Sequence, residues 1–385
     1  MQTRDDIELF EEKNLAPYAM KSKDSKGRYY PEPAHATRTC YQRDRDRIVH
    51  SEAFRKLEYK TQVFTILEGD YYRTRLTHTI EVAQMARTIG RNLRLNEDLI
   101  EAISLAHDLG HPPFGHAGEE ALNKIMKKVG GFNHNKRSFD IVSKFEKRYP
   151  DFDGLNLTVE VRVGILKHQT IYDIPVFDPR LKESPTLEAQ VVDFADSLAY
   201  LNHDIDDGLT SGFISEKDLI DSSLWQKAVA RIKGKIDSDD KEMRKYQIVK
   251  ELIDMQIKDL LATTDQRLKK RHFRSVNEVK RLNKTIVGFS LEMTKARNAL
   301  QALLHEKLYL HYRVVRMTEK AKRIVGDLFH VYLHEPAQLP YSVYKRNKKY
   351  SQKEKYGIIC DHIASMTDRS ALDEHKKVFN PYEKV

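Results

Sequence analysis

The sequence predicts an all-α protein, and three observations favour this fold class. The chain has 16 glycines and 12 prolines, about 7% of 385 residues against an average near 12%, which disfavours turn-dense β folds and disordered tracts. Apolar residues recur at spacings of three and four, the period of an amphipathic helix. At this length a single core stops growing, so we expect a core over 1–230 and an appended helical region over 231–385.

Composition excludes several classes of protein. The two cysteines, Cys40 and Cys360, cannot form a disulfide framework or a four-cysteine zinc site. The sequence shows no signal-peptide pattern and no run of about 18 apolar residues, so we expect a soluble, cytoplasmic protein that does not enter a membrane. A net charge of +9 favours polyanionic partners such as nucleotides, nucleic acid or phosphorylated metabolites.

The first half of the chain supplies helices in a clear order. The first 45 residues show no long apolar period and predict a loop-rich start with short helices, and the pattern turns helical from Arg47 onward. An amphipathic helix follows, with one stripe formed by His78, Val82, Met85 and Ile89. Asn96 is expected to cap the next helix, and Gly110 with the two prolines after it ends that helix. Further helices are expected over 138–149 and 157–169.

The segment 187–207 carries the most informative helical pattern. Its apolar face is formed by Leu187, Val191, Phe194, Leu198, Leu201 and Ile205. A second stripe is polar and consists of Asp193, Asp196, Tyr200, His203 and Asp207. Val192, Ala195 and Ala199 flank this stripe instead of lysines, and carboxylates with little water around them call for a cation.

Charged amphipathic helices are expected from Ile214 to the end of the chain. Two basic clusters stand out, at 267–274 and 344–356. Each is either an ordinary solvated surface or a site of contact with nucleic acid or nucleotides, and the sequence leaves the two alternatives open.

Histidines gather in one stretch of the chain. Seven of the sixteen lie between residues 78 and 203: His78, His107, His111, His116, His134, His168 and His203. A lone histidine on an apolar face is usually a packed core residue, but here His107 and Asp108 end one helix, a neighbouring helix carries His78, and a later helix carries Asp196. Two imidazoles and two carboxylates suit a divalent ion such as Mn²⁺, Fe²⁺, Zn²⁺ or Mg²⁺ with positions open for water and a phosphate oxygen.

These residues lie in motifs that resemble a known family, the HD-domain deoxynucleoside triphosphate triphosphohydrolases of the bacterial dGTPase-like group. The motifs are TRTCYQRDRDRIVHSEAFRKLEYKTQVF (37–64), TRLTH (74–78), AHDLGHPPFGHAGE (106–119), GFNH (131–134), GLNLT (154–158), KHQ (167–169) and DSLAYLNHDIDD (196–207). A weaker similarity covers 312–340. The resemblance implies an HD-type helical fold, with a C-terminal helical region appended to it.

The resemblance also implies an activity and a set of roles. The family hydrolyses a deoxynucleoside triphosphate to the deoxynucleoside and inorganic triphosphate, with a metal and an activated water acting at the α-phosphorus. The metal ligands would be His78, His107, Asp108 and Asp196, the same four residues that the helix pattern favours. The catalytic residues would be His116, Glu119 and His111. The substrate contacts would be Gln62, Arg75, His134, Lys167, Tyr200 and Asp204.

Several of these assignments have simpler alternatives. Arg75 and Lys167 could be surface salt-bridge partners, Gln62 could be a helix-end residue, and His203 is interpreted as structural. Ser197 departs from the lysine that the related mammalian sterile-alpha-motif HD enzyme has after the last metal ligand, and Asn135 departs from its glutamate. Substrate preference therefore does not carry over from that enzyme.

Partners are expected from resemblance and charge. Family members form tetramers or hexamers, and some need a nucleotide activator at a subunit interface. A candidate activator site is the basic set Arg43, Arg45, Arg47, Arg55, Lys56 and Lys60, whose alternative is a solvated face. Alternative functions are an HD phosphodiesterase or phosphatase acting on another nucleotide, and a protein that binds nucleic acid, single strands included.

Overall fold

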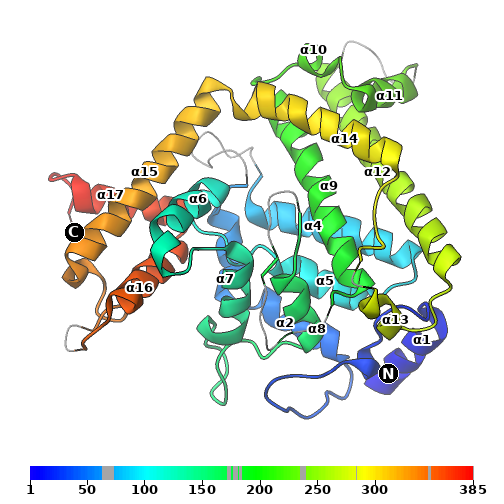
Figure 1. Cartoon of the computed structure of the whole chain (residues 1–385), viewed down its shortest axis with the longest axis horizontal. Coiled ribbons are helices and arrows are strands. Elements are labelled where there is room, and N and C mark those ends of the chain that lie inside the picture. Colours follow the sequence, from blue (N-terminus) through cyan, green and yellow to red (C-terminus); the bar gives the residue numbers. More distant parts are fainter. Residues whose placement is uncertain are drawn as a thin grey trace.

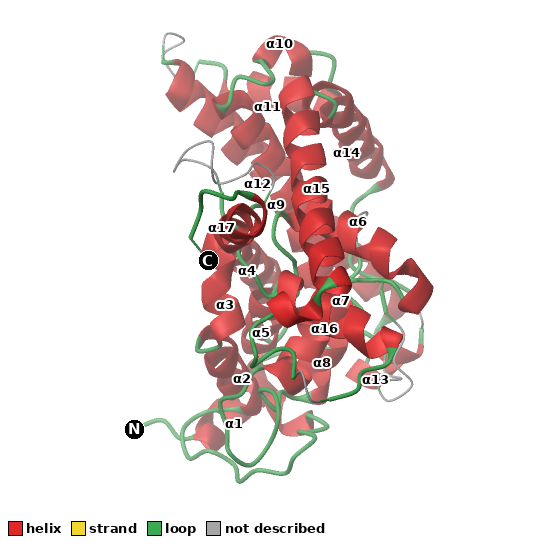
Figure 2. Ribbon diagram, turned by 90° about the vertical axis from the view of Figure 1, so that its left-hand side faces the viewer, coloured by secondary structure: helices red, strands yellow, loops and turns green. Residues whose placement is uncertain are grey.

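The computed structural model describes residues 1–62, 73–170, 175–176, 181, 184–234, 240–282, 284–345 and 348–384. Within these ranges the chain forms seventeen α-helices and no β-strand, with three isolated β-bridges (Figure 2). The predicted all-α class is confirmed. None of the described helices combines the length and the apolar character needed to cross a membrane.

The N-terminal region contains three helices, α1 (Arg4–Asn14), α2 (Cys40–Val49) and α3 (Glu52–Lys56). The short helices expected in the first 45 residues are present, but the helix that contains Arg47 begins seven residues earlier than expected. Helix α2 begins at Cys40 because Thr39 caps it: the Thr39 side chain accepts the N–H of Gln42, and the Gln42 side chain accepts the N–H of Thr39. This reciprocal pair satisfies two backbone donors that a helix start leaves unpaired.

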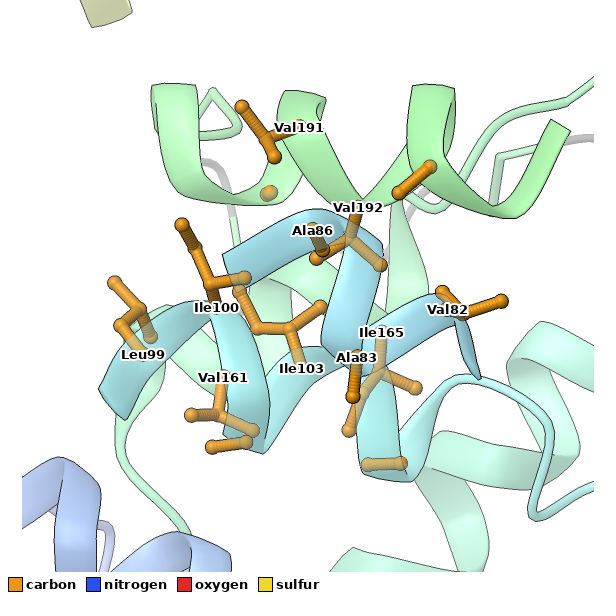
Figure 3. Close-up of a cluster of buried hydrophobic side chains, with 14 of the residues drawn as sticks. Val82, Ala83, Ala86, Leu99, Ile100, Ile103, Val161, Ile165, Val191 and Val192 are labelled. Carbon is orange, nitrogen blue, oxygen red and sulfur yellow. The ribbon is translucent and has the colours of Figure 1, made fainter. Parts of the chain in front are cut away.

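Four helices form the central layer and position most of the candidate site. They are α4 (Arg75–Asn92), α5 (Glu97–Ala106), α8 (Val159–Leu166) and α9 (Leu187–Thr210). Apolar side chains from all four meet in one cluster (Figure 3). Each fully buried aliphatic side chain in this cluster stabilises the fold by about 1.5–3 kcal/mol.

Local signals in the sequence explain these helices. Asn96 caps α5 as expected, since its side chain accepts the N–H of Leu99 at 3.1 Å. Close packing of α4 on α5 requires Gly90, because a Cβ there would lie 2.1 Å from Cδ1 of Ile100. The apolar face predicted for 187–207 is buried except for Phe194, which is half-buried.

Two further helices carry the histidine-rich segment, α6 (Gly115–Met126) and α7 (His134–Asp140). The helix expected over 138–149 is in fact α7 followed by one π-helical turn, Ile141–Phe145. It begins four residues earlier than expected because Asn133 caps it, with the Asn133 side chain accepting the N–H of Lys136 at 3.0 Å.

The rest of the chain is a run of helices, as expected. They are α10 (Glu216–Leu219), α11 (Ser223–Ile232), α12 (Lys241–Arg271), α13 (Val276–Arg281), α14 (Leu291–Leu304), α15 (Tyr312–His334), α16 (Gln352–Ala364) and α17 (Asp368–Phe379). Helix α9 extends from the central cluster into a second apolar cluster formed with α11, α12 and α14. A third cluster joins α6 to α15, α16 and α17, so these C-terminal helices pack against the histidine-rich segment (Figure 1).

Candidate active site and metal centre

The four predicted metal ligands lie together. His78 stands on α4, His107 and Asp108 follow directly after α5, and Asp196 stands on α9. Nε2 of His78 is 2.9 Å from Oδ1 of Asp196, and Nε2 of His107 lies 3.5 Å from Oδ1 of Asp108 and 3.8 Å from Oδ1 of Asp196. All four residues are buried. Three helices of the central layer therefore bring two imidazoles and two carboxylates to one point.

His107 has the hydrogen bonding of a metal-binding imidazole. Its Nδ1 lies 2.6 Å from the carbonyl oxygen of Ser104, so this nitrogen carries the proton and donates it. Its Nε2 is buried and has no hydrogen-bond partner in the described part of the chain. Burial lowers the pKa of His107, although Asp108 and Asp196 oppose the shift. A neutral ring with an unpaired Nε2 lone pair is what a metal requires.

The two carboxylates are held in the ionised form. Burial alone would raise the pKa of Asp108, but the Arg75 guanidinium, 2.7 Å away, and His107 hold it well below its ordinary value. Burial would likewise raise the pKa of Asp196, but the hydrogen bond with His168 holds it well below its ordinary value. Ionised oxygen ligands and neutral imidazoles together fit a divalent cation.

A second cluster lies on the other side of Asp108. It consists of His111, His116, Glu119 and His134. The Glu119 carboxylate accepts the backbone N–H of His134 at 2.9 Å and lies 2.9 Å from Nδ1 of that ring. Nδ1 of His116 is 3.6 Å from the same carboxylate, and Nε2 of His111 is 3.1 Å from Asp108. His111 thus touches both clusters.

Charge differs within this second cluster. Burial would raise the pKa of Glu119, but His134 and His116 hold it well below its ordinary value, so its carboxylate is ionised. Burial, Arg75 and His134 all lower the pKa of His111, which is therefore neutral near pH 7. His116 is about one-third exposed, whereas His111 and His134 are almost fully buried.

A tight turn places this second cluster. Phe114 adopts a left-handed conformation with φ of 63° immediately before α6. The Phe114 N–H donates to Asp368 at the start of α17 over 2.8 Å, and the N–H of Thr61 donates to the same carboxylate over 2.9 Å. Gly110 is required as well, because a Cβ there would lie 2.2 Å from the carbonyl oxygen of His134 and 2.3 Å from the N of Ser138.

The predicted substrate contacts fall into two groups. Arg75, Gln62 and Tyr200 line a cavity with three of the metal-ligand candidates, His111 and His116. Its volume is about 20 Å³, far below the roughly 300–1,000 Å³ of a ligand pocket, so a nucleotide requires the lining side chains to move apart. Among the described residues, Asp204 and Lys167 do not line this cavity.

Arg75 is not at the surface, which excludes the alternative of an exposed salt bridge. It is 1% exposed, and its Nη1 contacts Asp108, while its Nε and Nη2 are buried without a hydrogen-bond partner among the described residues. Gly115 leaves it room, since a Cβ there would lie 2.9 Å from Nη2. Gln62 is buried too, and its Oε1 has no partner in the described ranges. Lys167 is half-buried where α8 ends.

Three features of the site were not found from the sequence. His168 lies 2.7 Å from Asp193 and 3.2 Å from Asp196. Despite burial, Asp193 raises the pKa of His168 well above its ordinary value, so its ring is charged and donates to Asp196. The signal available was Asp193 itself, one helical turn before Asp196.

Tyr309 is the second missed feature. Its hydroxyl donates to Asp204 and lies 3.1 Å from the hydroxyl of Tyr200. Burial raises the pKa of Asp204 well above its ordinary value. No spacing in the sequence links Tyr309 to Asp204, because the contact depends on how α9 packs near the end of α14.

The third missed feature is the pair Glu81 and His203 behind His78. Nε2 of His203 lies 2.7 Å from Glu81, and Nδ1 of His203 lies 3.2 Å from Nδ1 of His78. Burial lowers the pKa of His203 to about 4. Glu81 stands three residues after His78 on α4, a spacing that could have suggested a shared face.

The basic set proposed from charge density does not form one patch. Arg43 and Arg47 pair with Glu32, and Arg45 pairs with acidic residues of α2 and α5. A separate cavity of about 560 Å³ is lined by the cations Arg55, Lys56, Lys60, Arg137, Lys147 and Arg148 and by the acids Glu52 and Glu146. The remaining half of the basic set therefore lies in a cation-rich cavity.

Comparisons with known proteins agree with this geometry. Residues 75–201 match the HD domain, and residues 287–377 match the phosphohydrolase-associated domain. A deoxyguanosinetriphosphate triphosphohydrolase-like protein of Geobacter sulfurreducens is 46% identical over the full length of both chains. Proteins of the same name from Geobacter metallireducens and Caulobacter vibrioides are 48% and 41% identical over at least 95% of both chains.

Proposed function

Because the chain belongs to the deoxyguanosinetriphosphate triphosphohydrolase-like family of HD-domain proteins, we propose that it hydrolyses deoxynucleoside triphosphates, dGTP or dNTPs generally. The reaction consumes water and yields the deoxynucleoside and inorganic triphosphate. The observation that carries the proposal is the pairing of a buried His₂Asp₂ set with an adjacent buried arginine whose Nε and Nη2 have no partner among the described residues.

The metal would be held by His78, His107, Asp108 and Asp196. A divalent ion bound there supplies Lewis acidity at the phosphate and lowers the pKa of water. Its identity among Mn²⁺, Mg²⁺, Fe²⁺ and Zn²⁺ stays a prediction. The chain contributes two ionised carboxylates and a neutral His107 whose Nε2 has no hydrogen-bond partner in the described ranges.

Arg75, His134 and Lys167 would hold the triphosphate. Arg75 is fixed by its ion pair with Asp108, so its remaining N–H groups are oriented before substrate arrives. Preorganised donors in a dry site stabilise charge that develops on the transferring phosphate without reorganising. Arg75 thereby links the metal ligand Asp108 to the phosphate.

His116 would protonate the leaving 5′ oxygen, with Glu119 as its carboxylate partner and His111 beside them. His116 lines the cavity and is the most exposed of the three histidines near Glu119. The ionised Glu119 carboxylate lies 3.6 Å from Nδ1 of His116 and can orient the ring for proton transfer.

Gln62, Tyr200 and Asp204 would bind the deoxyribose. Asp204 joins the hydroxyls of Tyr200 and Tyr309 in one hydrogen-bonded group. Gln62 has an unpaired Oε1 among the described residues, which could accept the 3′ hydroxyl proton. The C-terminal region, 231–385 in the proposed division of the chain, contributes Tyr309 to this group.

The test is incubation with each of the four dNTPs and with their mixture, in Mn²⁺ or Mg²⁺, followed by separation of products. We expect deoxynucleoside and inorganic triphosphate in equal amounts. Pyrophosphate or orthophosphate as the product indicates the alternative, a phosphatase or phosphodiesterase on another nucleotide.

Regulation by a second nucleotide is part of the proposal. The chain is expected to form a homo-oligomer, a tetramer or hexamer, with a dNTP activator near a subunit interface. The cation-rich cavity around Arg55, Lys56 and Lys60 supports this, since five arginine and lysine residues besides the buried Lys60 line it together with two acids. A coupling of about 1–3 kcal/mol would change substrate affinity roughly 5- to 150-fold.

The activator proposal is tested by assaying each dNTP alone and with a second, poorly hydrolysed dNTP. The Arg55→Ala/Lys56→Ala double variant should lose the activation, whereas exposed Lys295→Ala should keep it. Hyperbolic kinetics unaffected by every second nucleotide, with an unchanged oligomer size, would contradict it.

Two further expectations remain predictions. Binding of single-stranded nucleic acid would show an affinity that falls steeply with added salt, as it does when lysines and arginines neutralise phosphates. The cytoplasmic location rests on the sequence pattern described above.

A further inference from the structure

A chain of hydrogen-bonding groups lies behind the candidate metal ligand His78. Oε2 of Glu81 is 2.7 Å from Nε2 of His203, and Nδ1 of His203 is 3.2 Å from Nδ1 of His78. The two rings stand edge to face, with centroids 5.3 Å apart. At the far end, Nε2 of His78 lies 2.9 Å from Asp196. This series of side chains therefore runs from the carboxylate of Glu81 through the imidazoles of His203 and His78 to the metal cluster.

The direction of these hydrogen bonds follows from the groups themselves. Glu81 contacts Arg73 at 3.1 Å and its carboxylate can only accept, so Nε2 of His203 must carry a proton. Two imidazole nitrogens 3.2 Å apart form a hydrogen bond only if one of them carries the proton. His203 is 1% exposed, and burial disfavours a second proton on its ring, so Nδ1 of His203 accepts and Nδ1 of His78 donates.

This arrangement has one consequence for His78. With the proton on Nδ1, Nε2 of His78 is an acceptor 2.9 Å from an oxygen of the ionised Asp196, and two acceptors are compatible at this distance when a cation binds both. The opposite tautomer would place a proton where the metal must bind. Metal-binding histidines usually have such a fixing partner on the other nitrogen.

We propose that Glu81 and His203 are positioning residues that hold His78 in the tautomer and orientation required to bind the metal. The inference rests on the proposed function, because it assumes that His78 is a metal ligand. Glu81 and His203 touch neither substrate nor metal and act through His78.

Salt bridges with Arg73 hold Glu81 in place beside His203. Arg73, which precedes α4, contacts Glu81 together with Asp206 and Asp207 of α9, at 3.1, 2.8 and 2.6 Å. The start of α4 is thereby tied to α9 at the level of His203. Glu81 can then neither rotate away from His203 nor lose its charge, and the pKa of Glu81 falls to about 2 despite partial burial, because of His203 and Arg73.

The proposal is tested with three variants of the full chain after the metal is stripped. His203→Leu removes the acceptor for Nδ1 of His78. His203→Gln restores it, since the amide oxygen can accept from His78 while the amide N–H donates to Glu81. Asn202→Leu is the matched control: Asn202 is equally buried on α9 and hydrogen-bonds Leu198 and Gln256, away from His78.

The measurement is the Kd for Mn²⁺ by chelator competition, beside the Tm of each metal-free variant. We expect His203→Leu to weaken Mn²⁺ binding about 10- to 100-fold, the range for partners of metal ligands. His203→Gln should recover most of the loss, and Asn202→Leu should lower Tm with an unchanged Kd. If His203→Leu binds Mn²⁺ like the parent, or if Gln and Leu lose affinity equally, the proposal is wrong.

A second variant covers the case in which His203→Leu does not fold. Glu81 is 39% exposed in its side chain, so Glu81→Leu should fold and weaken Mn²⁺ binding toward the lower end of the same range. An unchanged Kd would overturn the proposal. Asp196→Asn separates this failure from that of the metal site itself: if it too binds Mn²⁺ normally, the four-ligand assignment fails, not only the role of His203.

Discussion

The two clusters of the candidate site are built in different ways. Three of the four metal-ligand candidates lie on, or directly at the end of, long helices of the central layer, and Asp108 follows one residue later. The histidine cluster around Glu119 depends on the turn between α5 and α6, on left-handed Phe114 and on the C-terminal residue Asp368. Regular helices thus position the metal-ligand candidates, and a turn held by distant residues positions His116, the proposed proton donor.

The two clusters therefore suit different kinds of chemistry. Metal ligands must not move as the charge on the metal's other ligands changes, and packed helices meet that requirement. A proton donor must approach the leaving group as substrate binds in a cavity that is too small for it at rest. His116 is about one-third exposed at the start of α6, whereas His107 is almost fully buried.

The largest effect is expected from breaking the metal cluster alone. Asp196→Asn should keep the fold but remove nearly all bound metal and hydrolysis, because one of two ligand charges is lost. Metal analysis and turnover of the purified variant are the measurement. Asp254→Asn, half-exposed on α12, should retain both. A full metal complement with normal turnover would remove Asp196 from the set of ligands.

Substitution in the histidine cluster should lower kcat without removing the metal. His116→Ala is expected to keep metal content and nucleotide affinity while kcat falls roughly 10²- to 10⁴-fold, the usual loss of a general acid or base. The control is His330→Ala, exposed on α15, which should leave kcat unchanged. Collapsed affinity with a normal kcat would instead make His116 a binding residue.

Substitution in the turn between the two clusters should lower the stability of the protein. Gly110→Ala forces a Cβ against the backbone of α7, so we expect a loss of about 1–3 kcal/mol in the free energy of unfolding. Gly326→Ala in α15 is the matched control, because a Cβ added there would meet no atom of the described residues within 4 Å outside its own helix backbone. This substitution should raise the free energy of unfolding by about 0.5–1 kcal/mol. Denaturant unfolding measures both, and equal effects would contradict the account.

A pH dependence of stability is also expected at this turn. Lys60 is buried and donates to the carbonyl oxygens of His111 and Ala364. Burial, with Arg137 nearby, lowers the pKa of Lys60 from 10.5 to about 7. Between these values unfolding takes up a proton, so the stability that Lys60 contributes rises with pH.

The measurement compares the parent with Lys60→Met from pH 7 to pH 10. The difference in unfolding free energy should shift in favour of the parent as pH rises, by at most about 1.4 kcal/mol per pH unit. Parallel pH profiles would show that Lys60 is charged in the folded protein.

Helical period made the metal cluster predictable. His78 lies on an apolar stripe and Asp196 on a polar stripe without flanking lysines, and both patterns are local. The carboxylate partners of the arginines were not predictable. Arg45 pairs with Asp98 and Arg47 with Glu32, and the density of charges along the sequence does not indicate which distant residues will pair. Tyr309 was missed for the same reason.

Helix boundaries failed where a capping residue outweighed the apolar pattern. Thr39 starts α2 and Asn133 starts α7, and both stand ahead of polar first turns that show no apolar period. The turn at Phe114 was marked by its glycines and prolines, but its anchor, Asp368, lies 254 residues away. Contacts across such a distance depend on how the helices pack.

One measurement tests the central claim, that water attacks the α-phosphorus at the metal cluster while the histidine cluster protonates the 5′ oxygen. Hydrolysis of dGTP in ¹⁸O-labelled water is followed by mass spectrometry of both products. Attack at phosphorus breaks the P–O5′ bond, so we expect one ¹⁸O in the inorganic triphosphate and none in the deoxyguanosine. Label in the deoxyguanosine, or pyrophosphate in place of triphosphate, would contradict the account.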